Sequence, residues 1–125
     1  MGIKIFVLLS MVFMHIVDDY YLQGWLASAK QKSWWEKNAP GDLYKHDYIM
    51  ALFMHGFSWS FMIMLPLAAY AALTSSKFYP LLYFSNLLIH MCVDNLKANK
   101  KKINLVQDQI IHLIQIVATW VVVVF

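Results

Sequence analysis

Long blocks of apolar residues, separated by shorter polar segments, organise this chain of 125 residues. The blocks cover about residues 3–27, 48–73, 78–97 and 103–125. Each block is about as long as a helix that crosses the hydrocarbon core of a bilayer, which is roughly 30 Å thick. Because lipid cannot satisfy the hydrogen bonds of an open backbone, each block is expected to be helical. The pattern therefore predicts four transmembrane helices.

The connections between the blocks predict how the helices pack. The first connection, residues 28–47, is the only sizeable polar segment, whereas the connections at 74–77 and 98–102 are short. Short connections force neighbouring helices to run antiparallel. We therefore expect a single all-α domain over residues 1–125, a polytopic membrane protein built as an up-down bundle of four transmembrane helices.

The composition agrees with a membrane location. Apolar residues make up 61% of the chain and charged residues only 14%. A chain with so little polar surface belongs to the class of integral membrane proteins. At this length, only one small domain is expected.

Lysine supplies all 10 basic residues, and its distribution predicts the orientation. Most lysines lie in or beside the first and third connections, and only Lys4 and Lys77 belong to the other side. Because cytoplasmic loops carry the excess of positive charge, we expect these two connections in the cytoplasm and both termini outside. The net charge of +3 then requires no nucleic-acid partner. Membrane lipids are the expected partners, and contact of the lysines with anionic headgroups is an open alternative.

Three pairs of histidine and aspartate, each four residues apart, lie inside the apolar blocks. They are His15–Asp19, His90–Asp94 and Asp108–His112. Residues four apart project from one face of a helix. An ionisable group in hydrocarbon costs roughly 2.5–3.5 kcal/mol on insertion scales, so the three pairs are expected to meet one another.

The depth of these residues in the membrane supports a common site. At a rise of 1.5 Å per residue, the distances from the cytoplasmic end of the helix are between about 9 and 15 Å for Asp19, His55, His90, Asp108 and His112. The predicted layer in the cytoplasmic half of the membrane comprises His15, Asp18 or Asp19, Gln23, His55, His90, Asp94, Asp108 and His112. A purely structural polar network is the alternative interpretation of the same layer.

The charge of this layer favours a divalent metal. No basic residue is expected at that depth, and Lys97, near the rim, can pair with only one aspartate. Nitrogen and oxygen ligands without thiolates suit zinc best, with manganese or iron as alternatives. The candidate metal ligands are His15, Asp19, His55, His90, Asp94, Asp108 and His112. Because one tetrahedral ion needs fewer ligands, both a dinuclear centre and one metal with a general acid or base remain open.

Such a centre would generate a nucleophile from bound water near neutral pH. Asp19 and Asp108 are candidate catalytic residues, because a carboxylate paired with a histidine can act as a base or orient a ligand. Gln23 continues the face of His15 and Asp19 by one more turn and is the candidate for orienting a substrate. The spacing alone does not show which of these residues acts as a base, binds the metal or orients a ligand.

The motifs resemble those of a known family. His15-x3-Asp19-x3-Gln23, His90-x3-Asp94-x2-Lys97 and Asp108-Gln109-x2-His112 are similar to motifs of a family of uncharacterised small integral membrane proteins that phages and prophages often encode. The resemblance covers nearly the whole chain. That family is similar in turn to bacterial inner-membrane proteins described as metal-dependent hydrolases. The resemblance implies a four-helix membrane fold with a His/Asp site, a location in a bacterial inner membrane and, more remotely, hydrolytic activity.

Two positions depart from that family pattern. Asp18 stands where the family usually has a small residue, and Ala51 stands where a second histidine is common, one turn before His55. His46, nearer the membrane surface, is a candidate substitute for that histidine. The parts played by Asp18 and His46 therefore stay open at this point.

Two functions from different classes fit these features. The first is a membrane-embedded, metal-dependent hydrolase that acts on a lipid or lipid-linked substrate at the cytoplasmic leaflet. The second is a non-enzymatic phage membrane protein that permeabilises the membrane, excludes superinfecting phage or binds a host partner. The outer half of the bundle is expected to be apolar, as in residues 121–125, which disfavours a pore or transporter. A homodimer through the small residues Ala68, Ala69, Ala71 and Ala72 is an open alternative to a monomer.

The lysine asymmetry makes a testable prediction about topology. A membrane-impermeant thiol reagent applied to intact cells should label a cysteine placed at Ser76 and should not label one placed at Asn38. The reverse pattern of labelling would invert the orientation.

Overall fold

Helices make up the architecture of residues 2–125, which the computed structural model describes. Helix accounts for 79% of the described residues, which contain no strand. The order is α1 (Gly2–Val17), the π-helical turn η1 (Asp18–Leu22), α2 (Leu26–Ala29), α3 (Lys32–Asn38), α4 (Asp47–Thr74), α5 (Leu81–Ala98) and α6 (Leu105–Val124). The fold is therefore all-α, as predicted.

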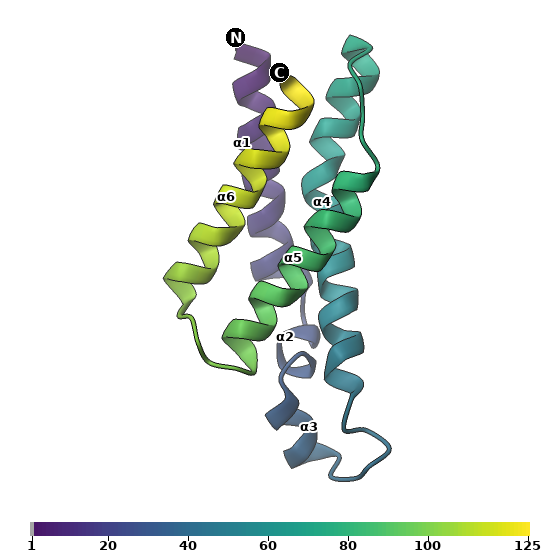
Figure 1. Cartoon of the computed structure of the whole chain (residues 1–125), viewed down its shortest axis with the longest axis vertical. Helices are drawn as coiled ribbons and strands as arrows, with labels where there is room; N and C mark the ends of the chain where they lie inside the picture. The colour runs from purple at the N-terminus through teal and green to yellow at the C-terminus, as the bar shows by residue number, and fades with distance from the viewer. Residues whose placement is uncertain (1) are drawn as a thin grey trace.

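The long helices α1, α4, α5 and α6 stand side by side, and successive long helices run in opposite directions (Figure 1). Both termini lie at one end of the bundle, and the short helices α2 and α3 lie at the other (Figure 1). In this arrangement, the ends of the long helices that lie away from the termini face the segment that links α1 to α4 (Figure 1).

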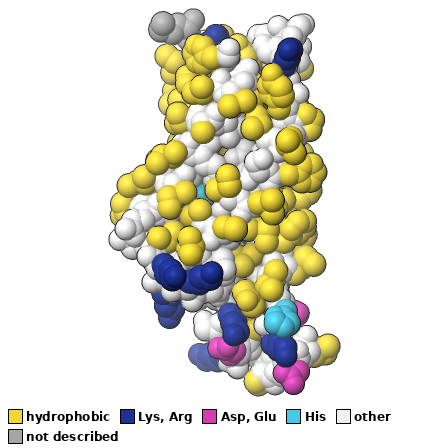
Figure 2. Space-filling view, viewed as in Figure 1, with side chains coloured by type: hydrophobic (Ala, Val, Ile, Leu, Met, Phe, Trp, Pro, Cys, Tyr) yellow, Lys and Arg dark blue, Asp and Glu magenta, His cyan; other side chains and the backbone are white. Residues whose placement is uncertain are grey.

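Three helical segments are long and apolar enough to span a membrane: Gly2–Leu22, Asp47–Thr74 and Leu105–Val124. The remaining long helix, α5, is interrupted by polar residues, among them Asn86, His90 and Asp94, which lower its mean hydropathy. Hydrophobic side chains cover much of the visible surface of the bundle, and lysines gather toward the end that carries α3 (Figure 2). An apolar surface of this extent is typical of a chain in contact with lipid.

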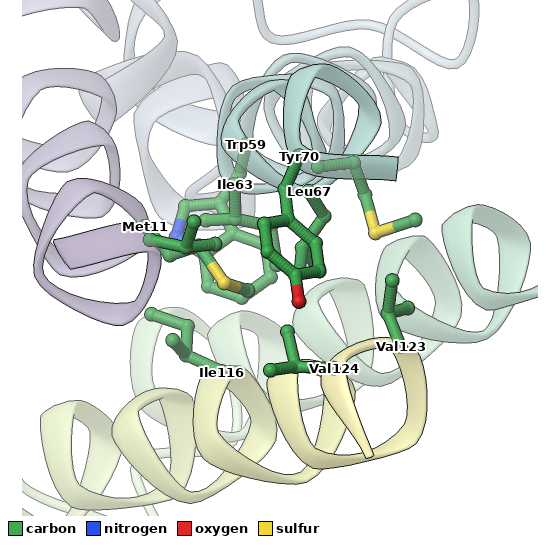
Figure 3. Close-up of a cluster of buried hydrophobic side chains, with 10 residues drawn as sticks. Met11, Trp59, Ile63, Leu67, Tyr70, Ile116, Val123 and Val124 are labelled. Atoms are coloured by element: carbon green, nitrogen blue, oxygen red, sulfur yellow. The ribbon is translucent and has the colours of Figure 1, made fainter. Parts of the chain in front are cut away.

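A cluster of buried apolar side chains fills the bundle on the side of the termini. Met11, Trp59, Ile63, Leu67 and Ile116 are fully buried and come from α1, α4 and α6 (Figure 3). Trp59 lies at the edge of this cluster, where its indole also contacts histidine rings. The apolar core therefore adjoins a polar layer.

The first predicted helix, residues 3–27, is divided in the structure. The amide of Gln23 donates to the carbonyl of Asp18 at 3.0 Å, an i→i+5 bond that widens the turn in η1. The widened turn buries both Asp18 and the adjacent Asp19. Gly24 then adopts a φ of +49°, a left-handed conformation that glycine adopts without steric cost and that ends the helix.

The other predicted boundaries differ less. The second predicted helix, residues 48–73, agrees with α4 to within a residue at each end. The third and fourth begin three and two residues later than predicted, at Leu81 and Leu105. The polar segment 28–47 is not all loop, because it contains α3 and the end of α2.

Gly56 allows α4 and α5 to approach closely. A Cβ at this position would lie 3.0 Å from Cγ of Met91 and 3.3 Å from the carbonyl oxygen of Leu87. Small residues at such crossings let membrane helices pack backbone to backbone. The close approach brings His55 on α4 near His90 on α5, with their ring centroids 5.0 Å apart.

We predict that Gly56→Val lowers the thermal stability of the detergent-purified protein, because the added methyl groups force α4 away from α5. Overpacking of this kind costs about 1–3 kcal/mol. Gly41→Ala is the matched control, since its nearest contact would be Tyr44 at 4.0 Å. Equal melting temperatures for the two variants would show that the α4–α5 contact is not tight.

Candidate metal centre

The histidines and aspartates of the apolar helices converge in one buried layer. η1 contributes two of them, α5 and α6 contribute two each, and α1 and α4 contribute one each. None is more than 8% exposed: His15, Asp18, Asp19, His55, His90, Asp94, Asp108 and His112. The layer lies between the apolar core and the segment that carries α2 and α3.

Asp19, His55 and His90 form the first group of possible metal ligands. Oδ1 of Asp19 lies 3.2 Å from Nε2 of His55 and 3.9 Å from Nε2 of His90. Two ligand atoms of a tetrahedral zinc ion with bonds of 2.0–2.1 Å are separated by about 3.3 Å. The spacing of Asp19 and His55 therefore matches a shared metal.

His90, Asp94 and His112 form the second group. Oδ1 of Asp94 lies 3.4 Å from Nε2 of His112, and Oδ2 of Asp94 lies 3.8 Å from Nε2 of His90. Oδ2 is also 3.4 Å from Nε2 of His55, a residue of the first group. His90 belongs to both groups, and Asp94 joins them, so the two groups form one continuous cluster.

Stacked rings hold His90 in place. Its ring stacks on Trp59 and on His112, with centroid separations of 4.2 Å in each case. Neither ring nitrogen of His90 has a hydrogen-bond partner. Ring stacking on both faces thus orients the imidazole, and its nitrogens stay available as metal ligands.

Unpartnered polar atoms are concentrated in this layer. Both ring nitrogens of His55, His90 and His112 lack hydrogen-bond partners, as does one carboxylate oxygen each of Asp18, Asp19 and Asp108. Buried polar atoms are nearly always partnered in proteins, because an unpaired one costs about 1–3 kcal/mol. A cation coordinated by the histidines would satisfy one nitrogen of each ring, and the donor set fits a divalent metal.

His15 lies beside the groups but is held differently. The indole Nε1 of Trp59 donates to its Nδ1 at 2.7 Å, and its Nε2 lies 3.0 Å from Oε1 of Gln109, to which it donates. Asp19 is 3.3 Å from Nδ1, as expected for a pair four residues apart. Because both ring nitrogens are engaged, His15 is better suited to orient the layer than to bind a metal.

Asp108 also lies at the side of the two groups. Its Oδ1 is 3.4 Å from Nε2 of His112, and its Oδ2 accepts from Nε2 of Gln109 at 3.0 Å. Gln109 reaches further to Oδ2 of Asp19 at 3.5 Å. This glutamine therefore connects α6 to η1 and α1 across the layer.

Two lysines reach the layer, which corrects the expectation that no basic residue lies at this depth. Lys30, in the segment predicted to be a polar loop, is only 6% exposed, and its Nζ donates to Oδ2 of Asp94 at 2.6 Å. Lys97 was expected near the rim, and its Nζ donates to Oδ2 of Asp108 at 2.5 Å. Two carboxylates are thus neutralised by lysine.

Asn99 fixes the segment that carries Lys30. Its Nδ2 donates to the carbonyl of Lys30 at 3.0 Å, and its Oδ1 accepts from the amide of Lys32 at 2.7 Å. Trp35 adds a further bond from its indole to the carbonyl of Ala29 at 2.7 Å. The chain therefore turns back against α5 after Gly24 and directs one lysine inward.

The two departures from the family pattern differ in their surroundings. Asp18 is fully buried, accepts from Oγ of Ser58 at 2.5 Å, and lies 3.6 Å from Nδ1 of His55. Its Oδ2 therefore faces the imidazole of His55 without a hydrogen bond to it. His46 is exposed at the start of α4 and is not part of the layer.

Gln23, the candidate for orienting a substrate, is half-buried beyond Asp19. Its Nε2 donates to the backbone carbonyl of Asp19 at 2.5 Å, and its Oε1 has no partner. The amide side chain is thus tied to η1 and has one free acceptor.

The sequence pattern missed Lys30 and Trp59, and it assigned no task to Gln109. Lys30 is one of several lysines in a polar segment. Only the turn at Gly24, which directs Lys30 into the bundle, distinguishes it from the other lysines of that segment. Trp59 follows His55 by one helical turn, a spacing that could have placed it on the same face. Gln109 adjoins Asp108, which gave no sign that it would bridge three helical segments.

Comparison with known proteins places the chain in a family. A family model matches residues 7–125, nearly the whole chain. The chain belongs to the DUF3307 family. That family is described as a protein of unknown function, a description that includes neither a phage origin nor hydrolytic activity. No curated protein and no solved structure matches this chain.

The buried ion pair of Lys30 makes a prediction about stability. Lys30→Met should destabilise the protein by about 3–5 kcal/mol, because removal of one partner leaves Asp94 charged and buried. The control is Lys32→Met, whose pair with Glu36 is exposed and whose loss should change stability by at most about 0.5 kcal/mol. Thermal unfolding in detergent measures both variants, and equal effects would contradict the buried pair.

Proposed function

We propose that this protein is a membrane-embedded, metal-dependent hydrolase that acts on a lipid or lipid-linked substrate at the cytoplasmic leaflet. One observation carries the proposal. Three buried imidazoles with unpartnered nitrogens surround the carboxylates of Asp19 and Asp94 at distances that suit ligands of one ion. Zinc is the expected metal, with manganese or iron as alternatives.

The charge of the layer favours one divalent ion. Its four aspartates, Asp18, Asp19, Asp94 and Asp108, are offset by the ammonium groups of Lys30 and Lys97, which leaves a net charge of −2 with neutral histidines. A divalent cation would bring this charge to zero. Neutrality matters because uncompensated charge is very costly in a region of low dielectric constant.

The proposed ligands are the members of the two groups: Asp19, His55, His90, Asp94 and His112. His15 is proposed as a positioning residue, since Trp59 and Gln109 hold both of its ring nitrogens. Asp18 is proposed to orient His55. This assignment moves His15 from the ligands to their support, while Asp108 is kept for the reaction.

When bound, the metal would lower the pKa of a water molecule and polarise the bond to be hydrolysed. Asp108 is the proposed general base, because its unpartnered Oδ1 points toward the histidine layer while Lys97 and Gln109 hold its other oxygen. Asp19 is proposed both to bind the metal and to hold the orientation of His55. Gln23 is proposed to orient the substrate through its free Oε1.

The proposed location follows from the helix lengths and the lysines. We propose that α5 is the fourth transmembrane helix, because it packs along α4 and α6 within the bundle. The lysine-rich end with α3 would then face the cytoplasm of a bacterial cell, and both termini would lie outside. A homodimer would have to use Ala68, Ala69 and Ala72, since Ala71 is buried inside the chain.

The second candidate function is a non-enzymatic membrane protein whose layer is a structural polar network. The ion pairs of Lys30 with Asp94 and of Lys97 with Asp108 favour it, because they neutralise two carboxylates without a metal. These pairs leave the ring nitrogens of His55, His90 and His112 without hydrogen-bond partners, however. The hydrolase proposal accounts for one nitrogen of each ring, the one that would bind the metal, and is therefore preferred.

Metal content tests the proposal. Detergent-purified protein prepared without chelators should contain about one divalent ion per chain, and added zinc or manganese should raise its melting temperature. Asp94→Asn should lower the metal affinity at least about tenfold while the protein still inserts in the membrane, and Asp108→Asn should lower both metal occupancy and hydrolysis. Elemental analysis and thermal unfolding give these values.

Asp42→Asn is the matched control, because Asp42 is exposed and pairs only with Lys45. It should retain the metal content of the wild type. Wild-type protein that contains no metal and gains no stability from added zinc or manganese would exclude the hydrolase and leave the structural network.

A further inference from the structure

A groove runs between α5 and α6, the two helices at the front of Figure 1. It has a volume of about 370 Å³ and is lined by apolar side chains that include Ile89, Ile111 and Val122. Four polar residues, Ser85, Asn86, Gln115 and Thr119, also line it. This polar group shows that the half of the bundle nearer the termini is not wholly apolar, contrary to the expectation from the sequence.

The groove begins beside the histidine layer. Ile89 and Ile111 line it, and they are the chain neighbours of His90 and His112. From Ile111 to Val122 the groove follows α6 for about 17 Å at 1.5 Å per residue. It therefore leads from the proposed metal centre toward the end of the bundle that carries the termini.

The polar residues form a fixed set of hydrogen bonds. Nδ2 of Asn86 donates to Oγ1 of Thr119 at 3.0 Å, and Nε2 of Gln115 donates to Oδ1 of Asn86 at 2.9 Å. Thr119 in turn donates to the carbonyl of Gln115 at 2.8 Å. These bonds hold the amide of Gln115 in one orientation.

One acceptor in this set has no partner. Gln115 is only 7% exposed, and its Oε1 lacks a hydrogen-bond donor within the described part of the chain. It is three residues from His112, so it lies about 5 Å further along the helix axis. Gln115 lines the groove, so a donor on a molecule in the groove that reaches this buried oxygen, a short distance from the metal layer, would satisfy it.

On the basis of the proposed function, we propose that this groove binds the hydrocarbon chain of the substrate, and that the chain carries a hydrogen-bond donor near its polar end. The donor would be an amide N–H or a hydroxyl that bonds to Oε1 of Gln115. The bond to be hydrolysed would then lie at His90 and His112, and the headgroup on the side of Lys30 and Lys97. The substrate class is an amide-linked or hydroxylated lipid.

The chemistry of the lining selects this occupant. Apolar side chains along about 17 Å of helix match an alkyl chain, which has no polar groups to satisfy along its length. A peptide segment would bring backbone donors and acceptors that such a lining leaves unpaired. A simple ester chain would fill the groove but leave the Gln115 acceptor unsatisfied.

Occupation of the groove is tested by filling it. Native mass spectrometry of the detergent-purified wild type should show one retained lipid, and Ala118→Trp should lower its occupancy about tenfold because the indole takes the space of the chain. Ala68→Trp is the matched control, since Ala68 lines a groove of about 350 Å³ between α4 and α5. It should keep the lipid.

The donor is tested with two probes of equal chain length, N-ethyloleamide and ethyl oleate, of which only the first has an N–H. In an equimolar mixture, delipidated wild type should bind the amide about fivefold more than the ester, the effect of one hydrogen bond. Gln115→Met should bind the two equally. A third probe, ethyl 2-hydroxyoleate, compared with ethyl oleate distinguishes a hydroxyl from an amide as the natural donor.

The outcomes separate this proposal from the metal centre. Loss of lipid in both tryptophan variants, or in neither, would overturn the groove as the chain site, and equal binding of all probes by the wild type would overturn the donor. The metal content is measured on the same samples. A metal-free protein that still selects the amide would retain the lipid site and exclude only the hydrolase.

Discussion

The need to neutralise four carboxylates inside an apolar bundle governs this structure. An ionised group in such surroundings costs several kcal/mol unless charge and hydrogen bonds compensate it. The compensating groups come from α1, from the segment after α2, and from α4, α5 and α6. No element of the bundle can supply them alone. The polar layer therefore joins all the long helices, while the apolar core above it provides general packing.

Two local departures from regular helix make this convergence possible. The π-helical turn η1 buries two successive aspartates, which the 100° rotation of an α-helix would direct to different sides. The left-handed Gly24 then ends the helix and lets the chain return, so that Lys30 enters from the connecting segment. Wide turns of this kind occur frequently at functional sites. Here the turn supplies carboxylates from η1 to both sides of His55.

Much of the helical arrangement could be predicted from the sequence, because apolar blocks and short connections determine it. The range predicted for α4 was nearly correct, and the four-residue spacing of histidine and aspartate indicated which faces turn inward. The break in the first helix was missed, since an i→i+5 turn leaves no composition signal. Lys30 was missed because lysine in a polar segment normally faces solvent. The engagement of His15 by Trp59 and Gln109 depends on packing between distant segments, which spacing within one helix does not reveal.

The polarity of α5 has a consequence for biogenesis. Its histidine, aspartate, asparagine and lysine make it a poor substrate for independent insertion by the translocon. These groups become acceptable in the membrane only after α4 and α6 cover them. In the proposed topology, in which α5 spans the membrane, α5 would therefore leave the insertion machinery together with a neighbour, and the α4–α5 hairpin, closed at Gly56, is the natural unit. In that topology the residues that form the polar layer would also set the order in which the helices enter the lipid.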